Sequence, residues 1–156
     1  MSTVKITEEQ LQLVEKLGLV FEGPGLQPAA ARVAALLVVS DTLELTFDDI
    51  REILNLSKSA TSNAINLLLN VHRIEYITKP GDRKRYFRSN LARWKNVMKE
   101  KFMDLEKTNS VLKEVVDQRT PATKEFNQSL EEMVSLMRFM NQQIPRLFKE
   151  WEKSKS

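Results

Sequence analysis

The sequence predicts a mainly α-helical protein with one small β-hairpin. Over most of the 156 residues, apolar side chains recur at the three- and four-residue spacing of a helix. One region departs from this pattern, because residues 73–78 and 85–89 alternate in hydrophobicity on either side of a Pro-Gly-Asp turn. Hydrophobic residues make up 42% of the chain, enough for a substantial core, and 29% charged residues favour solubility.

Two helices are expected before residue 40. Thr7 and Gln10 have the spacing of a capping box, which predicts a helix over 7–21. The segment 21–28 holds two Gly and two Pro and should end that helix. The Ala-rich, nearly all apolar run 29–39 then predicts a buried helix whose small side chains permit close packing.

A pair of helices joined by a tight turn follows. Residues 45–55 carry Thr46 as an N-cap and two Asp in the first turn, where the helix dipole favours anions. Ser57 is the next N-cap candidate, and 57–71 predicts the second helix. Helix, turn, helix and then hairpin is the order of a winged helix-turn-helix, here with additional helices at both ends of the chain.

The helix over 57–71 has an unusual polar side. It is built from hydroxyl and amide side chains, which are mediocre helix formers. Such side chains hydrogen-bond base edges in the DNA major groove, and they do not repel phosphate as Glu does. We therefore expect this side to contact DNA through Lys58, Ser59, Thr61, Ser62, Asn63 and Asn66. The alternative is an ordinary polar face in a winged helix that binds protein.

The turn of the hairpin is strongly basic. Lys79, Arg83, Lys84 and Arg85 surround the Pro-Gly-Asp turn, which we expect to contact the DNA backbone or enter the minor groove. Residues 57–101 hold 11 Lys and Arg against 3 Asp and Glu, whereas residues 1–56 hold 4 against 9. This concentration of positive charge favours a polyanionic partner. A charged strand edge that prevents aggregation is the alternative.

The C-terminal third predicts long helices with heptad-like apolar seams. One seam contains Phe102, Leu105, Asn109, Leu112 and Val116; the other contains Phe126, Leu130, Met133, Met137, Met140 and Ile144. Pro145 predicts a kink or a new helix start. We expect residues 1–26 and 91–156 to be helical dimerisation regions around a DNA-binding domain at 27–90. The alternative is that the two C-terminal helices pack on each other within one chain.

The runs "LNLSKSATSNAINLLL" and "RIEYITKPGDRKRYFRSN" resemble the GbsR/MarR group of bacterial and archaeal transcriptional regulators. The resemblance covers roughly residues 20–102 and leaves 103–156 without a match. It implies a winged helix in each half of a cytoplasmic homodimer, with Ser57–Asn66 as the recognition helix and Pro80–Arg85 as the wing. Some members are repressors that sense a small molecule; an effector for this chain, if any, is not identified by its residues.

These observations predict a sequence-specific, DNA-binding transcription regulator, a homodimeric repressor, that binds double-stranded DNA. The alternative function is a winged-helix interaction or scaffold module without DNA binding. We expect no enzyme, because the sequence shows no phosphate-cradling Gly loop and no nucleophile with a base. With no Cys and one His, we expect no metal or other cofactor. With no long apolar run or signal-like N-terminus, we expect no membrane span and a cytoplasmic location.

Overall fold

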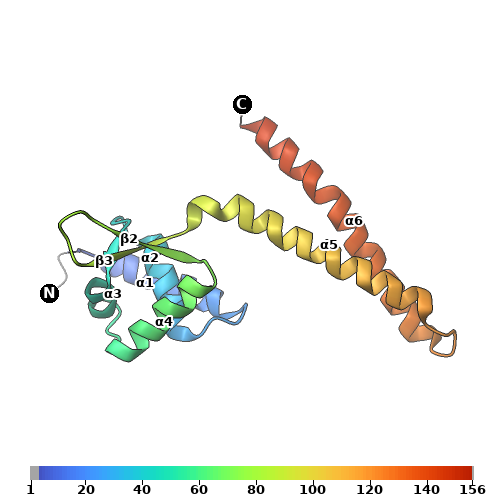
Figure 1. Cartoon of the computed structure of the whole chain (residues 1–156), viewed down its shortest axis with the longest axis horizontal. Helices are drawn as coiled ribbons and strands as arrows, with labels where there is room; N and C mark the ends of the chain where they lie inside the picture. Colours follow the sequence, from blue (N-terminus) through green and yellow to red (C-terminus); the bar gives the residue numbers. More distant parts are fainter. Residues whose placement is uncertain (1–3, 156) are drawn as a thin grey trace. The chain divides into compact units, whose positions relative to one another are not determined.

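The computed structural model describes residues 4–155, and the chain forms two compact units. The first unit ends at Arg93 and the second begins at Trp94. The first holds four helices and a small sheet, and the second is a pair of long helices (Figure 1). The predicted fold class, mainly α with a winged helix-turn-helix, is confirmed. Among the described residues, no helix is both long and apolar enough to cross a membrane.

The first two helices are α1 (Glu8–Glu22) and α2 (Pro28–Val39). The predicted capping box is confirmed, because the Gln10 N–H donates to Thr7 Oγ1 over 3.1 Å and the Thr7 N–H donates to Gln10 Oε1 over 3.0 Å. The two helices pack against each other. Arg32 of α2 lies beside Gly18 of α1, where an added Cβ would come within 3.0 Å of the Arg32 side chain. Glycine at this position therefore lets the arginine lie close against α1.

The next elements form the helix-turn-helix and the sheet. They are α3 (Phe47–Ile53), α4 (Lys58–Asn70), β1 (Leu45–Thr46), β2 (Ile74–Thr78) and β3 (Arg85–Ser89). The strands are antiparallel in the order β1-β3-β2, so β3 lies in the middle. The hairpin was predicted from the sequence but β1 was not, because a two-residue strand shows no alternation of its own. A short 3-10 turn, Leu91–Arg93, follows the sheet.

The core of the first unit is organised around α2. Seven of its twelve residues are buried, and α1, α4 and β3 all pack against it. The small side chains of α2 allow these neighbours to approach closely, as the Ala-rich sequence predicted. The fully buried large apolar side chains at the centre are Val14, Val33, Leu36, Leu45, Ile50 and Leu68.

The second unit consists of α5 (Trp94–Gln118) and α6 (Lys124–Ser154), which run antiparallel along each other (Figure 1). Edge-to-face aromatic pairs join the two helices: the rings of Trp94 and Trp151 are 5.6 Å apart, and those of Phe102 and Phe148 are 6.1 Å apart. Pro145 lies inside α6, which continues through it to Ser154. The expectation of a new helix start at Pro145 was therefore wrong.

Only half of the predicted α6 seam faces α5. Val134 is buried, and the side chains half-buried beside it recur at alternating intervals of three and four residues: Leu130, Met137, Asn141, Ile144 and Phe148. A second row, which recurs every seven residues, is 44–59% exposed: Phe126, Met133, Met140 and Leu147. The predicted seam mixed these two rows, because sequence spacing does not say which side of a helix meets its neighbour.

Asn109 occupies a core position of the α5 seam, as predicted. It is 8% exposed, and its Oδ1 atom has no hydrogen-bond partner among the described residues. The Nδ2 atom of Asn141 on α6 is likewise buried without a partner, and both residues line the same cavity of about 240 Å³. A polar spot therefore interrupts the apolar contact between α5 and α6.

Candidate nucleic-acid interface

Helix α4 begins at a well-formed N-cap. Ser57 Oγ accepts a hydrogen bond from the Ala60 N–H over 3.1 Å and lies 3.2 Å from Ser59 Oγ. No acidic residue stands in the first turn of α4, where Lys58 is exposed instead. The N-terminal end of this helix therefore presents backbone dipoles and positive charge without a competing carboxylate of its own.

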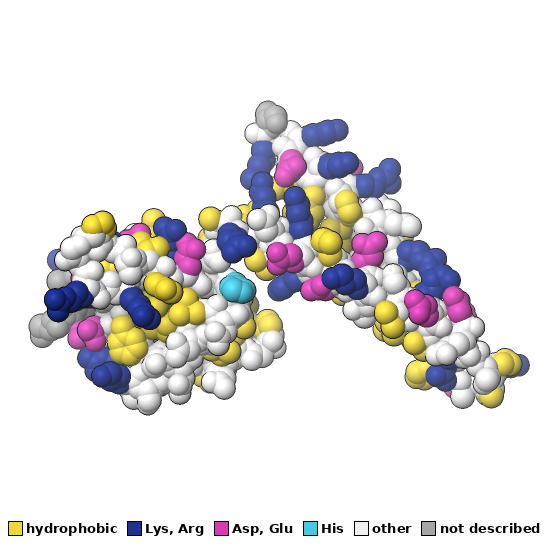
Figure 2. Space-filling view, in the orientation of Figure 1, with side chains coloured by type: hydrophobic (Ala, Val, Ile, Leu, Met, Phe, Trp, Pro, Cys, Tyr) yellow, Lys and Arg dark blue, Asp and Glu magenta, His cyan; other side chains and the backbone are white. Residues whose placement is uncertain are grey.

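The predicted polar side of α4 is outward-facing except at one position. Lys58, Ser59, Asn63 and Asn66 are exposed, and Ser62 is half-buried. Ser59, Ser62, Asn63 and Asn66 are spaced by three, one and three residues, so they lie along one side of the helix. In Figure 2 the surface over α4 is mostly white, the colour of the backbone and of side chains that are neither charged nor hydrophobic.

Thr61 is the exception, and its predicted place on this side was wrong. Its side chain is 0% exposed, and its hydroxyl donates to the Ser57 carbonyl over 2.9 Å. It shares the helix side of Ala64, Ile65 and Leu68, at intervals of three, one and three residues. A threonine can serve this buried role because it bonds back to the preceding turn and needs no external partner.

The wing, which we define as residues 79–85, is held in one shape by Asp82. The carboxylate accepts from the Tyr86 hydroxyl over 2.6 Å and from the Lys84 N–H over 2.9 Å. The Asp82 N–H in turn donates to the Lys79 carbonyl over 3.0 Å. Gly81 has a φ of 78°, a conformation that glycine adopts without strain. The tight turn predicted by Pro-Gly-Asp is therefore closed by both backbone and side chains.

Lys79 is engaged within the protein. Its Nζ lies 2.9 Å from Glu44 and 4.0 Å from the centre of the Tyr86 ring. Glu44 comes from the loop before β1, 35 positions away in the sequence, and no local pattern predicts this ion pair. In contrast, Arg83 and Lys84 are exposed, and among the described residues neither side chain forms an ion pair. The free positive charges of the wing tip are therefore Arg83 and Lys84.

The pKa values of the wing groups follow from these contacts. The Tyr86 hydroxyl and then the Lys84 N–H hold the pKa of Asp82 below its ordinary 3.8. The hydrogen bond to Asp82 raises the pKa of Tyr86, and the bond to Glu44 raises that of Lys79. Since the Asp82 pKa is lowered by folding, these bonds stabilise the wing above about pH 4 and are lost as the pH falls through the lowered value.

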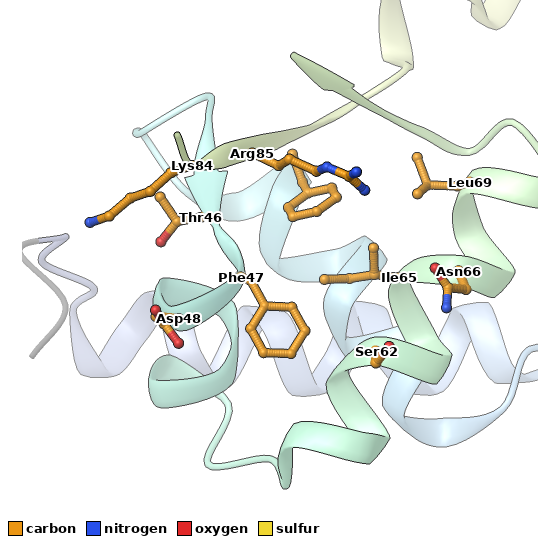
Figure 3. Close-up of a pocket in the computed structure, with 10 residues that line it drawn as sticks. Thr46, Phe47, Asp48, Ser62, Ile65, Asn66, Leu69, Lys84 and Arg85 are labelled. Carbon is orange, nitrogen blue, oxygen red and sulfur yellow. The ribbon is translucent and has the colours of Figure 1, made fainter. Parts of the chain in front are cut away.

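A groove of about 310 Å³ lies where α3, α4 and the base of the wing meet (Figure 3). Its floor is apolar, and Ser62 and Asn66 of α4 line one wall. Arg85 reaches from β3 across the groove toward α4, with its guanidinium 5.2 Å from the centre of the Tyr76 ring (Figure 3). Residues lining this groove are Thr46, Phe47, Asp48, Ser62, Ile65, Asn66, Leu69, Lys84, Arg85 and Phe87.

The groove brings together predicted residues from two separate segments. Asn66 and Arg85 are 19 positions apart in the sequence, and both line this groove. The sequence alone did not predict the apolar floor, to which Phe47 contributes. Nor did it place the Asp48 carboxylate here, 3.8 Å from Arg51. Asp48 disfavours phosphate on its side of the groove, so an anion is best placed toward Arg85.

Residues 92–154 match the family model described as "MmpR5-like MarR family transcriptional regulator". This match falls on the part that sequence inspection left without a resemblance, so that expectation was wrong for residues 103–154. It confirms a resemblance to MarR-type regulators over residues 92–154. The narrower GbsR grouping stays a prediction.

The fold is similar to that of a crystal structure described as a transcriptional regulator, with a TM-score of 0.68 and 21% sequence identity over 93% of this chain and 99% of that chain. At this identity the likeness shows the fold alone. The structure of MepR, a transcription regulator of the Staphylococcus aureus multidrug efflux pump MepA, has a TM-score of 0.43 and 16% sequence identity over 85% of this chain and 99% of that chain. The structure of the adhesin competence repressor AdcR from Streptococcus pyogenes has a TM-score of 0.39 and 22% sequence identity over 82% of this chain and 93% of that chain. No curated protein matches the sequence.

Replacing Thr61 by Val tests its buried position. Valine keeps the volume and loses the hydroxyl, while the Ser57 carbonyl still accepts from the Thr61 backbone N–H over 3.0 Å. We expect the free energy of unfolding to fall by about 1 kcal/mol or less, measured by urea unfolding followed by circular dichroism, with base preference unchanged. Asn63→Ala, at an exposed position, is the control for stability and should leave the free energy of unfolding unchanged. A changed base preference in Thr61→Val would show that Thr61 faces the partner.

Proposed function

We propose that this chain, with its MarR-type fold, is a sequence-specific DNA-binding transcription regulator that acts as a homodimer. One observation carries the proposal: Ser62 and Asn66, on the hydroxyl and amide side of α4, line one groove together with Arg85. A helix in the major groove and an adjacent wing then engage the same duplex together. A dimer bound at an operator blocks transcription by occupying the promoter, so we assign it the role of a repressor in the cytoplasm.

The α4 side chains supply base contacts in this proposal. Asn63 and Asn66 have amides that bond adenine in a bidentate manner, and the hydroxyls of Ser59 and Ser62 donate or accept. All four have short side chains, so α4 lies deep in the major groove when they reach the base edges. Thr61 is withdrawn from the predicted set because its side chain is buried.

The cations supply sequence-independent affinity. Lys58 at the start of α4, Arg83 and Lys84 at the wing tip, and Arg85 in the groove are placed to contact phosphates or the minor groove. In Figure 2, Lys and Arg side chains stand out at the end of the first unit that carries the wing. Lys79 has its charge matched by Glu44, so we assign it a structural role in the wing.

The proposed dimer rests on the exposed row of α6. Phe126, Met133, Met140 and Leu147 recur every seven residues, which is the repeat of a helix that packs against another helix. Helix α5 already covers the neighbouring row, so a further helix is needed to cover this one. A second copy of the chain supplies that helix. The exposed Leu13, Leu19 and Val20 of α1 add apolar surface, in keeping with predicted dimerisation by both terminal regions.

Arg83→Ala tests the phosphate role of the wing tip. We expect weaker binding to all DNA sequences and a plot of log K against log salt concentration that is flatter by about 0.9, because one phosphate contact is lost. Fluorescence anisotropy titrations at several salt concentrations measure this slope. Lys79→Gln is the comparison and should leave the slope unchanged, since its charge is matched by Glu44. Undiminished binding and an unchanged slope in Arg83→Ala would refute this role.

Asn63→Ala tests base readout by α4. We expect preference at particular base pairs to relax by about 1–3 kcal/mol, with the salt slope unchanged, because an amide that reads a base carries no charge. Selection of bound sites from random DNA with wild type and variant measures this. If wild-type protein shows no salt-dependent DNA affinity at all, the protein-interaction alternative is favoured.

Met140→Lys tests the proposed dimer. A charge in the exposed heptad row should shift the full-length protein toward monomer at micromolar concentration, because a lysine cannot be buried there without cost. Sedimentation equilibrium measures the association constant. Gln128→Lys adds the same charge at an exposed polar position on another side of α6 and should stay dimeric. A wild-type protein that sediments as a monomer would contradict the proposal directly.

A further inference from the structure

Tyr86 stands at the meeting point of the contacts that shape the wing. Its hydroxyl donates to Asp82 Oδ2 over 2.6 Å, and its ring lies 4.0 Å from Lys79 Nζ. One aromatic side chain therefore contacts both Lys79 and Asp82, the first and last residues of the turn that precedes Arg83. The sequence alone places Tyr86 only within the second strand of the predicted hairpin, residues 85–89.

The backbone of Tyr86 is itself firmly placed. Tyr86 lies in β3, the middle strand, where it pairs with Thr46 of β1 and with Ile77 of β2. The sheet ends one pair further on, at Thr78 and Arg85, and residues 79–84 project from it as the tip of the wing. A hydroxyl anchored on the middle strand is thus bonded to a carboxylate in the projecting turn.

A second contact supports the same arrangement from outside the hairpin. Lys79 is held by Glu44, which also lies 3.9 Å from Arg88 of β3. Arg88 in turn bonds Glu75 of β2 over 2.6 Å. These exposed ion pairs are individually weak. The hydrogen bond between Tyr86 and a charged carboxylate is of the stronger kind, so it is the contact on which the shape of the turn depends most.

We propose that Tyr86 is a positioning residue for DNA binding: its hydroxyl, acting through Asp82, holds the wing in the conformation that presents Arg83 and Lys84 to the duplex. The inference rests on the proposed function and deepens it. Tyr86 itself need not contact DNA. Its effect is to order the wing when the protein folds. The conformational entropy of the wing is then not lost on binding DNA, and its loss does not lower the affinity.

Tyr86→Phe isolates the hydroxyl. Phenylalanine keeps the ring and its contact with Lys79, and it removes only the bond to Asp82. We expect affinity for a selected operator to fall roughly tenfold, since a few wing residues must then be ordered at the moment of binding. The salt slope should stay at the wild-type value, because no charge that meets phosphate is lost. If Tyr86 mattered only for folding, Tyr86→Phe would lower the free energy of unfolding, and the folded protein would bind the operator with wild-type affinity.

A double-mutant cycle gives the sharper readout. If the hydroxyl acts by presenting Arg83, then Arg83→Ala should cost less affinity in the Tyr86→Phe background than in wild type. Purely additive losses would overturn the proposal. Ser89→Ala is the matched control: it removes from the same strand, away from the wing, a hydroxyl that makes no hydrogen bond with any residue between 4 and 155, and it should bind as wild type does.

Amide hydrogen exchange of the free protein tests the physical basis without DNA. In Tyr86→Phe the Lys84 N–H, which donates to Asp82, should exchange at least severalfold faster, while the amides of α2 and α4 keep their protection. Unchanged exchange at Lys84 would overturn the proposal. If the wild-type protein shows no salt-dependent DNA binding, both the proposed function and this inference are overturned. If the wild-type protein binds DNA and Tyr86→Phe binds it equally well, the inference alone is overturned.

Discussion

Helix α4 buries Ala64, Ile65 and Leu68 in the core formed with α2, and this contact decides which of its side chains remain for a partner. A helix that must satisfy a core on one side has a fixed rotation about its axis. The hydroxyl and amide row then faces outward, while Thr61 turns inward and bonds the preceding turn. The rest of the proposed interface depends on this rotation, because the groove shared with Arg85 exists only when Asn66 lies on its wall.

The wing supplies charge in a form that is ordered before any partner arrives. Of the four predicted cations at its ends and tip, Lys79 has a carboxylate partner and Arg85 reaches back over the groove beside Tyr76. Arg83 and Lys84 are left free at the tip. Positive charge in the middle of the sequence is therefore divided into a part that shapes the wing and a part available to phosphate.

The second unit uses α6 on two neighbouring sides. One side packs against α5 within the chain through Val134 and its half-buried neighbours, and the alternative of intrachain packing is thus present in the structure. The row that includes Met133 and Met140 remains exposed beside it. Intrachain packing and dimerisation are therefore compatible in α6, because each uses its own row of side chains.

The sequence by itself determined the elements whose signals are local. The caps at Thr7, Thr46 and Ser57, and the turn at Gly81, lie where predicted, because each depends on residues within four positions of one another. Only the tertiary structure decided that Thr61 is buried, that Lys79 meets Glu44, that β1 pairs with β3, and which α6 row faces α5. Each of these depends on contacts between distant segments, which fix the rotation of a helix or the partner of a charge, and no local spacing encodes them.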